Sequence, residues 1–269
     1  MVNFRRVVTV FAVLALFTGL AFAQQENCSA QATNSTPLRG EGFTEQTGDI
    51  IINCVGGQPL AAGVNIPLVN ITVFYNTTVT SRLLPTTSGG TGQTSNQTSE
   101  ALLIIDEPNT NPLALPVGTG VNQVAYGQTQ GMNPCLTPLT GCTEAVGPTV
   151  TGFSTAVPNY NVYQGVVNGN SVTFYGVPVL PPTTVGSRVY RITNVRVNAN
   201  QLTGGSATGG TTPVQSFITV SGSAALPISN SQPIVGYIQN GLTASVSGSK
   251  TYQQCNSQSK VTAATVKFT

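Results

Sequence analysis

The stretch RVYRITNVRVN, residues 188–198, decides the fold. It alternates with a period of two and is rich in β-branched residues, which is typical of a β-strand. The side that we expect to face the core holds Val189, Thr193, Val195 and Val197. Arg191 falls on that same side, so we expect either a β-bulge that turns Arg191 to solvent or a buried arginine that needs a carboxylate partner.

Similar β-branched runs, bounded by Gly, Pro, Asn and Ser, recur along the chain without a convincing 3.6-residue apolar period. The other strands that we expect are Asp49–Val55, Val69–Thr80, Ala101–Asp106, Asn122–Tyr126, Asn161–Val167, Ser171–Tyr175, Val214–Ser221, Ile234–Ile238, Leu242–Val246 and Val261–Phe268. Many short strands with turn signals between them predict an all-β fold of the antiparallel β-sandwich type, as one continuous domain or as two packed β units.

Two segments have the same plan and predict hairpins with long loops. Val69–Leu84 precedes a Gly/Thr/Ser-rich loop and then Ala101–Asp106, while Arg188–Leu202 precedes a similar loop and then Val214–Ser221. The likeness indicates either an internal duplication or only the common look of hairpins in a Thr-rich β protein.

Residues 1–23 have the features of a secretory signal peptide. Arg5 and Arg6 precede the apolar run Val7–Leu20, and Ala21-Phe-Ala23 supplies the small residues of a cleavage site. An uncleaved N-terminal anchor is the alternative. Cleavage after Ala23 changes the formal net charge from +2 to zero, which predicts a secreted, extracellular or cell-surface protein with no general attraction to nucleic acid or to membranes.

Charge is divided unevenly along the predicted mature chain. All acidic residues lie within 24–144, an acidic β-rich half, whereas 145–269 is a basic half without Asp or Glu. Any carboxylate partner of Arg188, Arg191 or Arg196 must therefore come from the first half or from another molecule. We hypothesise that Arg191 forms such a bond between the halves.

The chain has no histidine, which excludes the ordinary serine triad, a cysteine–histidine nucleophile and histidine-ligated metals. Paired carboxylates remain, as in glycoside hydrolysis, with Glu41, Glu45 and Asp49 or the pair Asp106 and Glu107 as candidates. Solvated surface acids are the simpler interpretation, and we expect no enzymatic activity.

The loop after the strand Ala101–Asp106 offers oxygen ligands for one metal. Asp106, Glu107, Asn109 and Asn111 make a weak calcium candidate, although Pro108 and Asn109 equally make a simple turn. We expect no other cofactor.

Five cysteines remain in a chain that is predicted to be exported, where disulfides form. Cys135 and Cys142 bracket a turn-prone loop and are the first expected pair, and Cys28 with Cys54 is the second. Cys255 is then left over, either as an inert thiol or for an intermolecular bond.

The segments RGEGFTEQTGDIIINCVGG (39–57), NITVF (70–74), TSRLL (80–84), EALLIIDEP (100–108) and RITNVRVNAN (191–200) resemble a group of uncharacterised secreted β-rich bacterial proteins of acidobacterial type. The resemblance implies compartment and fold class and carries no activity. It also implies that related chains continue past Val261–Phe268, so this sequence is expected to be a fragment.

These features predict a secreted, non-catalytic structural or surface-interaction protein whose partners are copies of itself or cell-surface components. In one form, acidic and basic halves of successive copies associate head to tail; in the other, the halves neutralise each other within one molecule. The alternative is a carbohydrate-binding module, and a carboxylate-pair glycoside hydrolase is the third. The module would use tyrosines among Tyr126, Tyr160, Tyr163, Tyr175 and Tyr190.

Overall fold

The structure is a computed structural model of the 269-residue chain. It describes residues 26–33, 36–58, 60, 64–84, 98–107, 132–144, 149–150, 153–154, 160–202, 212–241, 244–246 and 266–268. The predicted signal peptide, the expected strand Asn122–Tyr126 and the residues Asn109, Asn111 and Cys255 lie outside this part.

The fold is all-β, as the sequence predicts, and no α-helix occurs among the described residues. The strands of the main sheet are β1 (Asn27–Ala32), β2 (Thr36–Arg39), β4 (Ile50–Gly56), β5 (Leu68–Tyr75), β6 (Thr98–Ile105), β9 (Val162–Asn168), β10 (Ser171–Pro178), β11 (Thr183–Thr193), β13 (Thr212–Gly222), β14 (Ile228–Ser229) and β15 (Ile234–Gln239). The short strand pairs are β3 (Glu45–Gln46) with β12 (Arg196–Val197), β7 (Thr149–Val150) with β8 (Phe153–Ser154) and β16 (Ala244–Val246) with β17 (Val266–Phe268). A 3₁₀ turn, η1 (Ala199–Gln201), follows β12.

The acidic and the basic half form one sheet rather than two β units. Its order is β14-β1-β4-β11-β6-β9-β10-β5-β13-β15-β2, so first-half and second-half strands interleave. In particular, β11 of the second half lies between β4 and β6 of the first, and β5 of the first half lies between β10 and β13 of the second. The boundary at Glu144 is therefore a boundary of composition and does not divide the fold.

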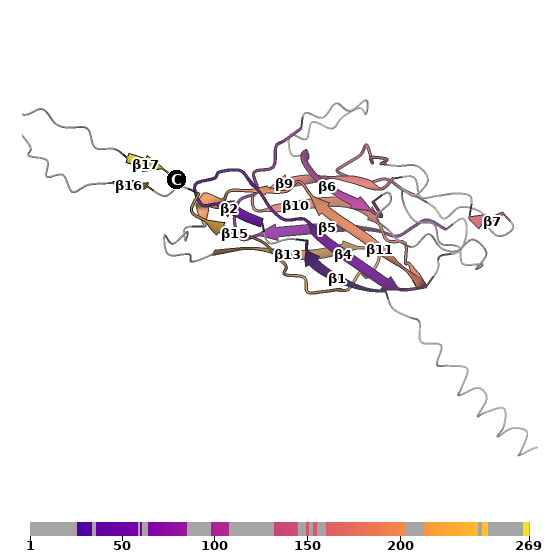
Figure 1. Cartoon of the computed structure of the whole chain (residues 1–269). Coiled ribbons are helices and arrows are strands. Elements are labelled where there is room, and N and C mark those ends of the chain that lie inside the picture. The colour runs from indigo at the N-terminus through magenta and orange to yellow at the C-terminus, as the bar shows by residue number, and fades with distance from the viewer. Residues whose placement is uncertain are drawn as a thin grey trace, which may run out of the picture.

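The sheet curls, so that β1 and β15, which are far apart in the strand order, come close to each other (Figure 1). The strands β14 and β15 are at or next to opposite ends of the strand order, yet only residues 230–233 separate them in the chain. A hydrogen bond from Gly48 N to Val235 O at 2.7 Å also joins the start of β4 to β15. The pairs β1–β14 and β15–β2 are parallel, and the other pairs in the main sheet are antiparallel.

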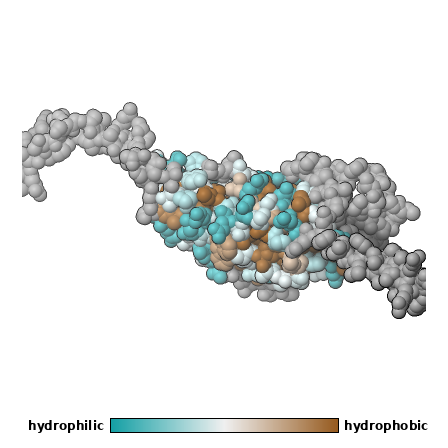
Figure 2. Space-filling view, turned by 90° about the horizontal axis from the view of Figure 1, so that it is seen from below, coloured by the Kyte–Doolittle hydropathy of each residue, from teal (hydrophilic) through white to brown (hydrophobic). Residues whose placement is uncertain are grey.

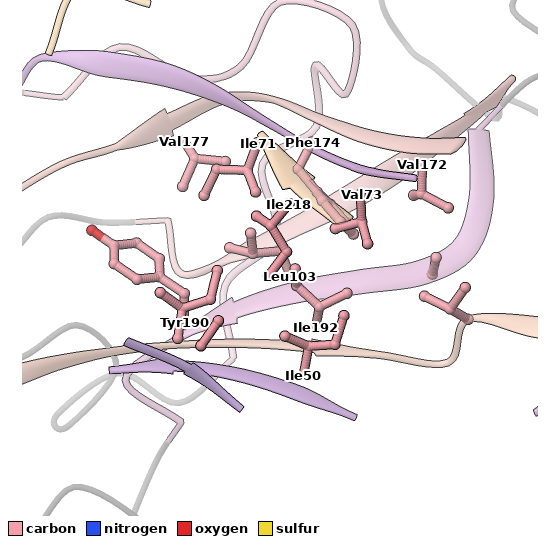
Figure 3. Packing of buried hydrophobic residues seen from close by; sticks show 14 of the residues in the cluster. Ile50, Ile71, Val73, Leu103, Val172, Phe174, Val177, Tyr190, Ile192 and Ile218 are labelled. Carbon is pink, nitrogen blue, oxygen red and sulfur yellow. The ribbon is translucent and has the colours of Figure 1, made fainter. Parts of the chain in front are cut away.

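The core lies between the two facing parts of this curled sheet. Figure 3 shows Ile71, Phe174 and Ile218, from β5, β10 and β13, pointing toward Ile50 and Ile192, from β4 and β11. These side chains are almost completely buried and belong to one hydrophobic cluster. The alternating burial of β4 and β5 follows directly from the period-two pattern of their β-branched residues.

The first hairpin expected from the sequence is present only at the base of its long loop, where residues 82–84 pair with residues 98–100, and the second hairpin is wrong. The strands β5 and β6 are separated in the sheet by β9 and β10, and β11 and β13 are also far apart in the strand order. Only the segment before the long loop returns to β6, through the bridge between Leu83 and Ser99. The connection from β5 to β6 and the connection from β11 to β13 therefore each cross from one part of the curled sheet to the other.

The expected inward face of β11 is also wrong for the first part of that stretch. Arg188, Tyr190 and Ile192 point inward and are buried, so Arg191 lies on the outer face. Asn194 then adopts a φ of 59°, which breaks the alternation, and Val195 and Val197 become buried as expected. A period of two applies only between such breaks, and asparagine is one of the residues that tolerate a left-handed conformation.

Candidate functional site: an arginine–carboxylate cluster between the halves

The most buried charged group of the described residues is an ion pair between Arg188 and Asp106. The Arg188 side chain is 3% exposed and Asp106 is inaccessible to solvent. Arg188 Nη1 donates to Asp106 Oδ2, and Nε donates to the carbonyl oxygen of Leu180 at 3.1 Å. Asp106 Oδ1 accepts the backbone N–H of Val189 at 2.9 Å. The pair therefore fixes the end of β6 against β11 from inside the sheet.

Arg191 forms the outer counterpart of this pair and contacts two carboxylates of the first half. Its Nε and Nη2 donate to Asp49 Oδ2 at 2.8 and 2.6 Å, and its Nη1 donates to Glu107 Oε2. The hydrogen bonds to Asp49, followed by those to Glu107, raise the pKa of the Arg191 guanidinium. The residue is one-third exposed rather than buried, but the hypothesised bond between the halves is present.

Arg196, in the short strand β12 that follows β11, is the third arginine of the second half to bind a carboxylate of the first half. Its Nε donates to Glu100 Oε1 at 2.8 Å, while Glu100 also lies 3.8 Å from Arg82. The arginines of the second half that the sequence singles out therefore all find their carboxylates in the first half of the same molecule. The remaining acids other than Glu26 also accept hydrogen bonds. Glu45 accepts one from Arg39, whereas Glu41 and Glu144 accept the backbone N–H groups of Gly241 and Tyr160.

This arrangement favours the intramolecular of the two charge hypotheses. The carboxylates that a head-to-tail contact would use are bonded to Arg188, Arg191 and Arg196 of their own chain. The same pairing bears on the calcium candidate. Asp106 and Glu107 contact different arginines, on opposite faces of β11, while Asn109 and Asn111 lie outside the described residues. Calcium binding stays a prediction that this geometry does not favour.

Glu26 is the buried acid that the sequence did not single out. It is 6% exposed, and its Oε1 has no hydrogen-bond partner among the described residues. Burial raises the pKa of Glu26 to about 7, against the opposing effect of the nearby Arg188 charge. Its carboxylate lies within 4.8 Å of the sulfur atoms of Cys28 and Cys54. Those sulfurs form a disulfide, so this group of three offers no thiolate ligands to a metal in the oxidised chain.

We expect Glu26 to make stability depend on pH in a window that is otherwise quiet. Between about pH 4.5 and 7 the folded chain keeps a proton on Glu26 that the unfolded chain has released, so the free energy of unfolding falls as pH rises. Glu26→Gln should remove most of this slope and stabilise the chain at pH 8 by on the order of 2–3 kcal/mol. Urea unfolding at several pH values measures both effects.

The matched control is Glu45→Gln, which removes a carboxylate whose partner, Arg39, is exposed to solvent. Because the chain has no histidine, no imidazole titration overlaps the window. A slope that survives in Glu26→Gln would show that another group carries it.

Both expected disulfides are present. Cys28 is joined to Cys54 across the paired strands β1 and β4, and Cys135 is joined to Cys142 around the loop between them. Within the described residues, no helix has the length and the hydropathy that crossing a membrane requires. Disulfides are typical of an oxidising compartment, which agrees with the predicted location outside the cytoplasm.

The residues proposed for sugar binding and for acid–base chemistry are not brought together. Tyr163 and Tyr190 are buried in the core, and burial raises the pKa of both phenols. Tyr160 and Tyr175 are partly exposed, and Tyr126 is not described. Of the candidate acids, Asp49 and Glu107 do converge, but the Arg191 guanidinium lies between them and binds both.

Comparison of the chain with protein-family models, with curated proteins and with solved structures finds no match. The resemblance to secreted β-rich bacterial proteins therefore stays a prediction.

The structure also shows a division of charge that the sequence order hides. The adjacent strands β9, β10, β5 and β13 contain no charged residue, whereas the ion pairs lie around β11 and β6 and, for Arg39 and Glu45, at β2 and β3. Absence of charge in each of these four segments is visible in the sequence. Their adjacency is not, because it depends on crossovers between distant parts of the chain.

Proposed function

We propose that this chain is an exported, non-catalytic structural or surface-interaction protein that makes its contacts through uncharged surfaces. The observation that carries this proposal is the internal use of charge. The arginines of the second half bind carboxylates of the first half, which leaves four adjacent strands without charge for contacts with other molecules.

Three further features support the proposal. The predicted signal peptide and the two disulfides agree with an extracellular location, where a disulfide-bonded β fold resists unfolding. The predicted mature chain is electrically neutral, so its contacts do not depend on a charged partner. Of the candidate acids, Glu45, Asp49, Asp106 and Glu107 form ion pairs with arginines of the same chain, which fits a structural role.

Fractionation of the native host tests the proposal. We expect the protein in the extracellular or cell-surface fraction, still attached after a wash at about 1 M salt, where exposed charges are screened beyond about 3 Å. Release at moderate salt would contradict contacts through uncharged surfaces. Recovery from the cytoplasm would contradict export.

Purified protein gives a second check of the same point. We expect the sedimentation coefficient to be the same at low and at high salt, whatever the size of the species, because the charges are paired within each molecule. A species that dissociates as salt increases would instead support the head-to-tail charge hypothesis.

A further inference from the structure

Three neighbouring strands give the molecule an uncharged face. We use this name for the outward-pointing side chains of β10, β5 and β13, whose registers are continuous from strand to strand. On the next strand, β9, the outward-pointing Val162 and Val166 are buried and do not belong to this face. Each of these strands carries only uncharged side chains, and the outward positions of β5 and β10 alternate with buried residues of the core. In Figure 2, which shows the body from below, apolar residues lie in separate spots between hydrophilic ones.

Two phenylalanines lie next to each other on this face. Phe74 of β5 and Phe217 of β13 are directly paired across the strands, and their exposed fractions are 38% and 43%. Side chains paired in this way have Cβ atoms roughly 4.5–5.5 Å apart. On the other side of Phe74, its partner in β10 is Ser171, a small residue that is itself buried.

A row of hydroxyl groups runs beside the two rings. Thr173, Thr72 and Thr219 occupy matching positions on β10, β5 and β13, two residues along from the row that holds the phenylalanines. The hydroxyls of Thr72 and Thr173 are hydrogen-bonded at 3.0 Å. Thr219 donates its hydroxyl proton to the carbonyl oxygen of Thr72 at 3.5 Å, so the row keeps acceptor lone pairs and one hydroxyl proton of the Thr72–Thr173 pair beside the aromatic rings.

This combination matches one class of ligand. Aromatic rings pack against flat apolar surfaces, and neighbouring hydroxyls recognise partners that also donate and accept. A neutral sugar ring offers both a C–H face and a rim of hydroxyls, whereas an anionic polymer would need positive charge that these strands lack.

We propose that the uncharged face binds a neutral polysaccharide, which stacks on Phe74 and Phe217 and hydrogen-bonds to the threonine row. This proposal rests on the proposed function and names the surface component that the chain contacts. It assigns the binding to residues other than the tyrosines expected from the sequence, because Tyr163 and Tyr190 are in the core.

The size of the face favours an extended chain over a second copy of the protein. Three strands spaced by about 4.8 Å and three outward rows spaced by about 7 Å cover roughly 300 Å². A stable protein–protein interface buries about 800 Å² on each partner. A polysaccharide strand needs only a narrow track, and its repeated units can bind several copies of the protein at once.

Co-sedimentation with insoluble polysaccharides tests the proposal. The probes are microcrystalline cellulose, insoluble xylan and chitin, with alginate gel as the anionic contrast. We expect binding to at least one neutral polymer, unchanged by salt, and little binding to alginate. The double variant Phe74→Ala/Phe217→Ala should weaken this binding about tenfold or more, since two aromatic contacts are lost.

The matched control is Phe43→Ala, which removes a phenylalanine that is 65% exposed just before β3 and away from the uncharged face. This variant should bind as the original chain does. Circular dichroism must show that the variants remain folded, and Thr72→Val offers a milder second change on the same face. Equal binding by Phe43→Ala and by the double variant, or no binding to any neutral polymer, overturns the proposal.

Two other results would assign the face to another occupant. If sedimentation equilibrium shows a dimer that only the double variant disrupts, a second copy covers the face and the polysaccharide proposal is wrong. Preference for alginate would also overturn it. Either result leaves the proposed function standing if the protein remains salt-resistant in the surface fraction, whereas cytoplasmic recovery would remove the proposed function itself.

Discussion

Asp106→Asn is expected to lower the free energy of unfolding by about 3–5 kcal/mol, the cost of leaving a buried charge without its partner. The Arg188 side chain is 3% exposed, so solvent contributes little to compensate its charge when the Asp106 carboxylate is lost. Asparagine is chosen because Asp106 has a φ of 42°, a conformation that asparagine tolerates, so backbone strain is not added. Urea unfolding followed by circular dichroism measures the change.

Glu107→Gln is the matched control for this variant. It removes a neighbouring carboxylate whose partner, Arg191, is one-third exposed and keeps Asp49. We expect a cost of about 1 kcal/mol or less. The double variant Asp106→Asn/Arg188→Met should recover much of the loss, because it removes the unpaired buried charge and keeps at position 106 a residue that tolerates the left-handed conformation. A cost for Asp106→Asn no larger than that for Glu107→Gln would contradict the buried pair.

Removing the disulfide between Cys28 and Cys54 should have a comparable effect. The bond closes a loop with a sequence separation of 26, for which chain entropy predicts a loss of about 3.5 kcal/mol. The variant Cys28→Ala/Cys54→Ala keeps small apolar residues at two buried positions of β1 and β4. Thermal unfolding at fixed pH measures the loss.

The second disulfide supplies the comparison. Cys135 and Cys142 have a sequence separation of 7, which predicts a loss of about 2.4 kcal/mol for Cys135→Ala/Cys142→Ala. We therefore expect the first double variant to melt at the lower temperature. The opposite order would show that loop entropy does not determine what these bonds contribute.

Strand positions were predictable from the sequence, whereas strand partners were not. The runs that become β4, β9 and β13 show their boundaries through β-branched residues and flanking turn residues. Nothing local indicates that β5 pairs with β10 and β13 rather than with β6. Pairing depends on which apolar faces meet in the curled sheet, and that is a property of the whole chain.

The arginine cluster shows the same limit at the level of single residues. Composition alone required the carboxylate partners of Arg188, Arg191 and Arg196 to lie before residue 145 or in another molecule, and they lie in the same chain. Parity selected Arg191 as the buried residue because the left-handed conformation of Asn194 was not foreseen. Continuing the pattern backward from Tyr190 and Ile192 would have indicated Arg188 instead.

Hydrogen exchange of the backbone amides tests most directly the claim that the acidic and the basic half form one unit joined by these ion pairs. The predicted result is a single free energy of opening shared by the central amides of β4 and β6, from the first half, and of β11, from the second. Asp106→Asn should lower it in all three strands together. Two separate groups of amides, divided at residue 144, would contradict the account.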